Sequence, residues 1–293
     1  MQAHLHEAEG YLELEHEGRA LCRYVYRPDT PRYESPRPYF HPVTTLGGAL
    51  LTDYRPPDHP WHVGISMTVT NLSGHNFWGG PSFVRDQGYV PLPNQGVEQH
   101  LGWSAEDPRR LVEALSWIGH DGSQLLEESR TLAPHISGER LWGLTLRFDL
   151  RNVTGRELVF RSPTTDGRPM AGYGGLFWRG PASFVGGRIA AAGAGGPEMM
   201  GRRSPWLAYT GRDERGELAT IAFIDHPDNP RFPTQWFVRQ EPYACATAAF
   251  MFDEPLSLPA GGRLVLRYRV LFADGELTGE EIDGLAEQFW REG

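Results

Sequence analysis

Glycine or proline interrupts this chain at short intervals, and the segments between these residues are rich in β-branched and aromatic side chains. The 293 residues include 35 glycines and 24 prolines. Both residue types disfavour helix interiors, whereas turns between short strands use them often. Strand-like segments lie between them, for example 64–72, 140–153, 218–225 and 263–272. Short strand-like segments separated by glycine and proline favour an all-β fold.

The segment 140–153 indicates how such strands would pack. Successive side chains of a strand point to opposite faces, so alternation of residue types puts one face against a core and the other toward water. The large apolar residues that alternate here are Trp142, Leu144, Leu146, Phe148 and Leu150. No β–α–β alternation occurs along the chain. We therefore expect a large antiparallel β-sandwich, with a hairpin over 11–26 that turns at Glu17-Gly18.

Helical periodicity is nearly confined to the end of the chain. Thr278 and Glu281 have the spacing of a capping box, in which each side chain binds the backbone N–H group of the other residue. Apolar residues then recur at helical spacing at Ile282, Leu285, Phe289 and Trp290. We expect one amphipathic helix over residues 279–291.

Residues 1–293 are treated as a single domain, because all-β folds of this length commonly form one unit. At this length roughly 75% of the surface of the unfolded chain can be buried, so no disulfide is needed to hold a core. The glycine- and alanine-rich stretch 186–196 is a possible boundary, but a surface loop or a hinge over a cleft explains it equally well.

The charged residues argue against nucleic-acid and membrane partners. The chain has no lysine, so its 28 basic residues are all arginine, and 37 acidic residues leave a formal net charge of −9. No arginine run exceeds two residues, and no apolar stretch approaches the roughly 20 residues that span a bilayer. The polar, acidic N-terminus is unlike a secretory signal, and Cys22 and Cys245 form no disulfide or metal pattern. We expect a cytoplasmic protein whose oligomeric state the sequence leaves open.

Candidate chemistry is densest in the proline-rich segment 56–78, which holds three histidines and an acid, namely Asp58, His59, His62 and His75. Prolines exclude a regular helix there, so only a turn would bring the rings of His59 and His62 to one point. Imidazoles in such a turn suit proton transfer or metal ligation. The alternative is a structural turn in which the Asp58 side chain caps the backbone and the histidines are polar turn residues without a role in function.

A second Asp-His-Pro tripeptide, residues 225–227, follows the expected strand 218–225. Loops that leave a strand often carry binding groups on a rigid scaffold. The following residues are polar and aromatic, and include Arg231, Trp236, Arg239 and Glu241. The alternative is a proline-stiffened connection in which Asn229-Pro230 starts a turn. We favour a binding role, because these side chains exceed what a turn requires.

The chain has nine tryptophans, and those in the polar segments favour a sugar-binding site. An indole can cover the apolar C–H face of a sugar ring, while Asp, Glu, Arg and His bind the hydroxyl groups. Trp61 and Trp236 stand inside the two polar segments, and Trp78 closes the first of them. Most of the other tryptophans are read as core anchors of a sandwich.

These residues resemble a family of bacterial proteins of unassigned function that often carry a "methane oxygenase" label. The resemblance implies a fold similar to the galactose-mutarotase-like supersandwich, and a role in carbohydrate metabolism beside sugar-converting oxidoreductases. The label itself is not carried over, because a membrane oxygenase needs spans that this chain lacks. Trp61 and Glu241 lie where the sequence departs from the family pattern. The matching pattern is Arg37-Pro38-Tyr39, Pro42-Val43, Asp58-His59-Pro60-x-His62-x-Gly64, Phe77-Trp78, Pro205-Trp206 and a run that joins Asp225-His226 to Thr234, Trp236 and Arg239.

The leading hypothesis is a carbohydrate-active enzyme of epimerase, lyase or hydrolase type that uses histidine and carboxylate acid–base chemistry on a sugar or sugar derivative. No cofactor is predicted for it. It requires the two Asp-His-Pro segments to meet at one pocket. The predicted acid–base residues are His59, His62 and His226, with Asp58 or Glu241 as the carboxylate. The predicted substrate-binding residues are Arg37, Trp78, Trp236 and Arg239.

Two alternatives stay open. One is a metal-dependent enzyme that holds a divalent metal through His59, His62 and a third ligand, His75 in the first instance, with His226 or Asp58 as the other choices. The other is a non-catalytic protein that binds a small carbohydrate and uses its histidines only as hydrogen-bonding groups.

Overall fold

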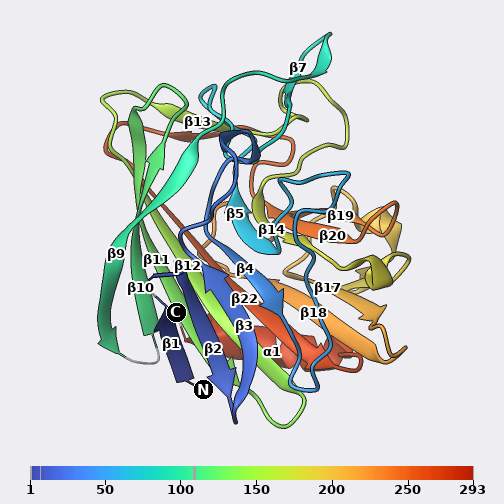
Figure 1. Cartoon of the computed structure of the whole chain (residues 1–293). Helices are drawn as coiled ribbons and strands as arrows, with labels where there is room; N and C mark the ends of the chain where they lie inside the picture. The colour runs from blue at the N-terminus through green and yellow to red at the C-terminus, as the bar shows by residue number, and fades with distance from the viewer. Residues whose placement is uncertain (1, 7, 108–109, 293) are drawn as a thin grey trace.

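The computed structural model describes residues 2–6, 8–107 and 110–292, and within them antiparallel strands form two large sheets. Figure 1 shows these sheets and the one α-helix of the described residues, α1 (Gly279–Arg291). The largest cluster of buried apolar side chains takes residues from both sheets, among them Leu14, Trp142 and Trp178. The predicted antiparallel β-sandwich with one C-terminal helix is thereby confirmed.

The first large sheet has eight strands and joins the N-terminal hairpin to strands from the middle and end of the chain. Glu17 and Gly18, with φ of 51° and 75°, make the hairpin turn that the sequence predicted. The strand order is β1 (Gln2–His6), β2 (Tyr11–His16), β3 (Arg19–Val25), β4 (Tyr39–Val43), β5 (Ile65–Thr68), β14 (Gly175–Arg179), β20 (Cys245–Ala249) and β19 (Gln235–Arg239).

The second large sheet has nine strands, and its longest ones carry the predicted alternation. Trp142, Leu144 and Leu146 on β12 are all buried in the core shared with the first sheet. The strand order is β16 (Ala194–Gly195), β15 (Arg188–Ala191), β17 (Trp206–Arg212), β18 (Leu218–Asp225), β22 (Arg263–Asp274), β12 (Leu141–Asn152), β11 (Gln124–Ile136), β10 (Arg110–Ile118) and β9 (Val97–Asp107).

The glycine- and alanine-rich stretch 186–196 forms an edge hairpin of the nine-stranded sheet, and not the loop or hinge that the sequence suggested. Its small side chains allow this close pairing. A Cβ atom added at Gly195 would lie 2.7 Å from the carbonyl oxygen of Ile189, so only glycine fits there.

Smaller elements complete the fold. One three-stranded sheet and one two-stranded sheet lie beside the large ones. No helix of the described residues is long and apolar enough to cross a membrane. The small elements are β21 (Leu256–Leu258), β13 (Leu158–Arg161), β6 (Asn71–Leu72), β7 (Ser82–Val84), β8 (Gly88–Val90) and the 3₁₀ turns Arg32–Glu34, Ala182–Phe184 and Pro197–Met199.

The helix α1 covers the outer face of the nine-stranded sheet. Thr278 accepts a hydrogen bond from the backbone N–H of Glu281, and the Glu281 carboxylate accepts one from the backbone N–H of Thr278. This is the predicted capping box, and the helix has the predicted bounds. Ile282 and Phe289 are buried on the sheet in a cluster with Trp206 and Leu271.

A cluster of buried charged side chains links the two sheets. Arg130 donates to Glu98 at 2.8 Å and to Glu128 at 2.6 Å, and all three side chains are almost fully buried. Arg130 also donates to the hydroxyl of Tyr24 on the opposite sheet, which in turn donates to Glu113. The core therefore depends on ion pairs as well as on apolar packing.

Burial raises the pKa of Glu98 to about 8, although the positive charge of Arg130 opposes this shift. A carboxyl group whose pKa is higher in the folded state stabilises the fold fully below the unfolded pKa of about 4.3, and this contribution is lost as pH rises through the folded value. The free energy of unfolding should therefore fall between about pH 5 and pH 8, and Glu98→Gln should flatten this decline. Urea unfolding across this range measures both slopes. Equal slopes in the two proteins would contradict the prediction.

Candidate active site

A cavity of about 410 Å³ lies against the outer face of the eight-stranded sheet, and we call it the aromatic cavity. Alternation along the strands decides which side chains reach it. Phe177 on β14 and Phe237 on β19 line it, whereas their neighbours Trp178 and Trp236 enter the core between the sheets. The complete lining is His59, Trp61, His62, Trp78, Pro81, Tyr89, Arg168, Tyr173, Phe177, Phe237, Arg239, Pro242, Tyr243 and Cys245.

The first Asp-His-Pro segment folds into a closed turn beside this cavity. The backbone N–H of His59 donates to Pro56 and that of His62 donates to His59, at 3.0 and 2.9 Å. The chain closes on itself where the N–H of Arg55 donates to the carbonyl of His62. The two imidazole rings stack, with centroids 4.5 Å apart and planes inclined by 21°. The turn predicted from the prolines therefore does bring both rings to one point.

Hydrogen bonds from one side fix the orientation of both rings. Nδ1 of His59 lies 2.7 Å from the Asp58 carboxylate, which is itself 3.3 Å from the guanidinium of Arg179. Arg179 also donates to Nδ1 of His62 at 3.0 Å. Because a guanidinium only donates, Nδ1 of His62 is an acceptor, and its Nε2 carries the proton. When neutral, His59 donates through Nδ1 to Asp58, so its Nε2 is a free acceptor.

Burial and the surrounding charges keep His62 neutral and Asp58 ionised. Burial holds the pKa of His62 well below its usual value, and the nearby basic groups His59, Arg179 and Arg37 lower it further. Burial alone would raise the pKa of Asp58, but the hydrogen bond from His59 and the charge of Arg179 outweigh it and lower that pKa. With His59 neutral, the turn presents a proton acceptor, His59 Nε2, beside a hydrogen-bond donor, His62 Nε2–H.

The rest of the lining is aromatic and cationic. None of the described residues that line the cavity is acidic, whereas Arg168 and Arg239 are positively charged. Arg168 donates to the hydroxyl of Tyr89, which lies 2.6 Å from that of Tyr173. Nε of Arg239 and Nε1 of Trp61 are buried donors without a hydrogen-bond partner among the described residues. Since buried donors normally find acceptors, these groups fit a ligand rich in acceptor oxygens.

Two glycines make room for the Trp61 indole. Gly79 and Gly80 have φ of 98° and 66°, and a Cβ atom at Gly80 would lie 2.5 Å from the indole ring. The close approach of the backbone therefore fixes one wall of the cavity.

Comparison with known proteins identifies the family. Residues 11–287 match the family of unknown function DUF6807. The chain belongs to this family. A search of the curated proteins found no match. The family carries no assigned function, which agrees with the resemblance found from the sequence.

His226 does not join the other two histidines. It lines a separate cavity, where its ring lies 5.0 Å from that of Phe289 on α1. The reason is topological. β18, which precedes His226, belongs to the nine-stranded sheet, whereas β19 belongs to the eight-stranded sheet. The second Asp-His-Pro segment therefore crosses between the sheets. The expected meeting of His226 with His59 and His62 at one pocket is wrong, although Arg239, further along the same run, does line the aromatic cavity.

Three further predicted residues of this DUF6807 member do not line the cavity. Trp236 is fully buried and donates from Nε1 to the carbonyl of Ser204. Arg37 is buried behind the cavity and donates to the carbonyls of Trp61 and Trp78, at 2.7 and 3.0 Å. It thus supports the wall instead of contacting a ligand. Glu241 is exposed and outside the lining.

Four of the predicted site residues line the aromatic cavity, namely His59, His62, Trp78 and Arg239. Trp78 packs edge-on against His62, with ring centroids 5.2 Å apart. Asp58 stands behind His59 instead of in the lining, so its contact with a ligand would be through the imidazole.

His75, the predicted third metal ligand, does not join His59 and His62. Nδ1 of His75 lies 2.8 Å from Nδ1 of His120, and His75 is absent from the lining that contains His59 and His62. Across residues 2–6, 8–107 and 110–292, no group of three or more His, Cys, Asp or Glu side chains is arranged to hold a metal ion. A ligand set of His59, His62 and His75 therefore does not fit this structure.

Sequence reasoning missed several lining residues. Arg168 lies in no motif that indicated this cavity, and neither does Arg179, which orients both imidazoles from outside the lining. Tyr173 and Tyr243 also escaped notice. Tyr243 stacks with the guanidinium of Arg179 at 4.0 Å, so it helps to hold the cation that positions both histidines. Strand alternation along 175–179 could have indicated Arg179, because it lies two residues from Phe177 and its side chain therefore points to the same face of the sheet.

Proposed function

We propose that this protein is an acid–base enzyme that acts on a small carbohydrate acid in the aromatic cavity. The observation that carries the proposal is the stacked pair of imidazoles, in which Asp58 and Arg179 orient one ring as an acceptor and the other as a donor. Such a pair is suited to moving a proton, and positioned acid–base groups typically contribute about 10²–10⁴-fold to a rate.

The lining favours an anionic substrate with an apolar face. Trp61, Trp78 and Tyr173 offer ring faces and edges to a sugar's C–H groups, while Arg168 and Arg239 suit a carboxylate. The sequence resemblance to sugar-handling supersandwich proteins supports the same substrate class by analogy, and carbohydrate metabolism in a bacterial cytoplasm is part of the proposal. Most glycoside hydrolases use two carboxylates, and the described lining has none, so an epimerase or a lyase fits better than a hydrolase.

In the proposed reaction, Nε2 of His59 takes a proton from the carbon next to the substrate carboxylate. The electron pair left on that carbon delocalises into the carboxylate, which the charge of Arg239 stabilises. Nε2–H of His62 donates a hydrogen bond to a substrate oxygen. Addition of a solvent proton to the opposite face, with release of the His59 proton to solvent, gives an epimer. Departure of a hydroxyl group from the next carbon, with a proton from solvent, gives a lyase product and water.

Arg239→Gln is expected to remove the preference for an acidic sugar. A charge-assisted hydrogen bond is worth about 1.5–3 kcal/mol, so the affinity for a uronate or aldonate should fall roughly tenfold or more, while that for the parent neutral sugar should change little. Calorimetric titration of wild type and variant with a panel of sugar acids and their neutral parents measures both. Arg212→Gln, an exposed arginine outside the lining, is the matched control.

The same panel, incubated with wild type in D₂O and followed by ¹H NMR, tests catalysis directly. Deuterium exchange at the carbon next to the carboxylate, or a new product, is expected. Saturable binding of an acid without exchange or product would instead identify a non-catalytic sugar-binding protein. Equal affinity for neutral and acidic sugars would reject the proposed substrate class.

A further inference from the structure

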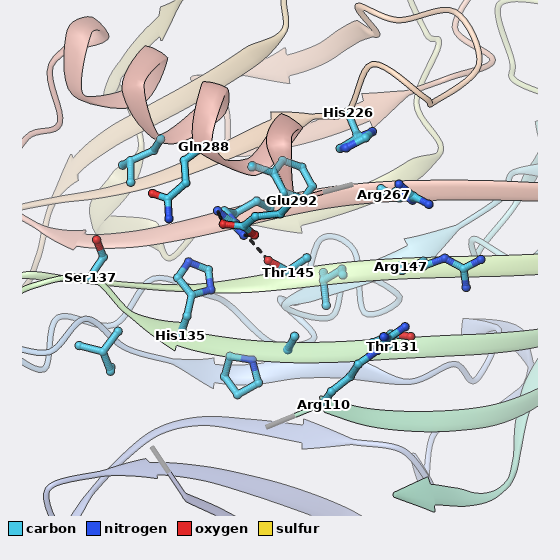
Figure 2. Close-up of a pocket in the computed structure, with 17 residues that line it drawn as sticks. Arg110, Thr131, His135, Ser137, Thr145, Arg147, His226, Arg267, Gln288 and Glu292 are labelled. Carbon is cyan, nitrogen blue, oxygen red and sulfur yellow. Dashed lines mark hydrogen bonds and ion pairs between the residues drawn. The ribbon is translucent and has the colours of Figure 1, made fainter. Parts of the chain in front are cut away.

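A second cavity, of about 630 Å³, lies on the outer face of the nine-stranded sheet under the end of α1. Figure 2 shows the helix above the strands, with His226, Arg267 and Arg147 grouped at one end and Ser137 at the other. We call it the arginine cleft, after the four arginines in its lining: Arg110, Arg147, Arg267 and Arg269. It shares no lining residue with the aromatic cavity.

The strand register places like charges next to each other in this cleft. Arg147 on β12 is directly opposite Arg267 on β22, and Thr131 on β11 is directly opposite Arg147. All three side chains lie on the outer face, since their neighbours Leu146 and Leu266 enter the core. Like charges that face each other across strands are destabilising, so an anion bound between the two arginines would relieve a repulsion.

The acidic partners of these arginines do not neutralise the cleft. Asp149 lies 2.6 Å from Arg147, but it also pairs with Arg263. Asp228 pairs with Arg267 at 3.0 Å and is largely exposed. On a chain with a net charge of −9, this is a local excess of positive charge.

Arg269 has a different role from the other three. It pairs with Glu292 at the end of α1, donates to Thr145 and lies over the ring of Phe289. The C-terminal end of a helix carries a partial negative charge, which disfavours an anion there. An anion is therefore expected at the end of the cleft that holds Arg147 and Arg267.

His226 supplies an unpartnered donor at that same end. Its Nδ1 accepts a hydrogen bond from the backbone N–H of Asp228 at 3.1 Å, so the neutral ring carries its proton on Nε2. The side chain is only 3% exposed, and Nε2 is buried without a hydrogen-bond partner among the described residues. A buried N–H group without an acceptor indicates a missing ligand oxygen.

We propose that the arginine cleft binds the phosphate group of a small ligand, with Arg147, Arg267 and Nε2–H of His226 as its donors. A phosphate carries nearly two negative charges and several acceptor oxygens arranged in three dimensions. It can therefore satisfy two guanidinium groups on the sheet and one N–H group above them, whereas a planar carboxylate has only two oxygens. The ligand is either free phosphate or a phosphate monoester.

The test is calorimetric titration of the whole protein with inorganic phosphate and with glucose 6-phosphate at constant ionic strength. Saturable binding is expected. Arg147→Gln and Arg267→Gln should each weaken it about tenfold or more, because each removes a charge-assisted hydrogen bond. Arg151→Gln is the control, since Arg151 is exposed on the same strand β12 and also faces an arginine, Arg263, but lies outside the cleft. It should change affinity less than about twofold.

The source of the phosphate follows from the two titrations. Tighter binding of glucose 6-phosphate would identify the ligand as a phosphate monoester. Its organic part would then contact the apolar part of the cleft, which includes Ile136, Leu285 and Phe289. Equal or tighter binding of inorganic phosphate assigns the free ion. Absence of saturable binding of either probe to wild type, seen also as unchanged ³¹P NMR line widths, would overturn the proposal, whether or not the variants fold. So would an equal loss of affinity in Arg151→Gln.

Discussion

His59→Gln is expected to lower the turnover of the proposed sugar-acid substrate by about 10²–10⁴-fold, because glutamine keeps a polar side chain but cannot accept the substrate proton. The side chain of His59 is partly exposed, so its replacement leaves no buried charge or large void. Affinity for the substrate should change much less than turnover, since the arginines that bind the carboxylate remain. Steady-state kinetics of the folded variant separate these two effects.

His120→Gln is the matched control for this variant. His120 is also exposed and also contacts a second histidine, His75, with ring centroids 4.5 Å apart, but it lies outside the aromatic cavity. Its turnover should equal that of wild type. Full activity of His59→Gln would remove the acid–base role. An equal loss in His120→Gln would attribute the effect to folding and not to the cavity.

Local patterns in the sequence predicted the elements of the fold well. Alternation along β12, the Glu17-Gly18 turn and the Thr278 capping box each depend on residues that are near neighbours in the chain, so the sequence shows the whole interaction. The turn that brings His59 and His62 together is equally local, because three prolines restrict only a few backbone angles.

The site was harder to predict, because it depends on which strands become neighbours. β18 and β19 follow each other closely in the chain but belong to different sheets, and this separates His226 from Arg239. Strand alternation did contain part of the answer. Trp236 and Arg239 are three residues apart on β19, so their side chains point to opposite faces and cannot both line one cavity.

The buried charges were the least predictable feature. Polar residues that alternate with apolar ones usually face water, so Glu98, Glu128 and Arg130 gave no sign of burial. In the structure these residues face the opposite sheet, where Arg130 also reaches Tyr24. These side chains are buried only because strands β9–β11 pack on the first sheet. The two sets of strands are far apart in the sequence, so no local pattern predicts this packing.

Arg130→Met is expected to lower the free energy of unfolding by about 3–5 kcal/mol, because it leaves the Glu128 carboxylate buried without its cation and the Glu98 carboxyl group without its hydrogen-bond donor. Methionine has a similar length, so a cavity adds little to this cost. Urea unfolding followed by tryptophan fluorescence measures the change, and Arg263→Met is the matched control. Arg263 pairs with Asp149 on the exposed face of the same sheet, where removal of an ion pair should cost less than about 1 kcal/mol. Equal losses in both variants would show that the buried cluster contributes no more than a surface pair.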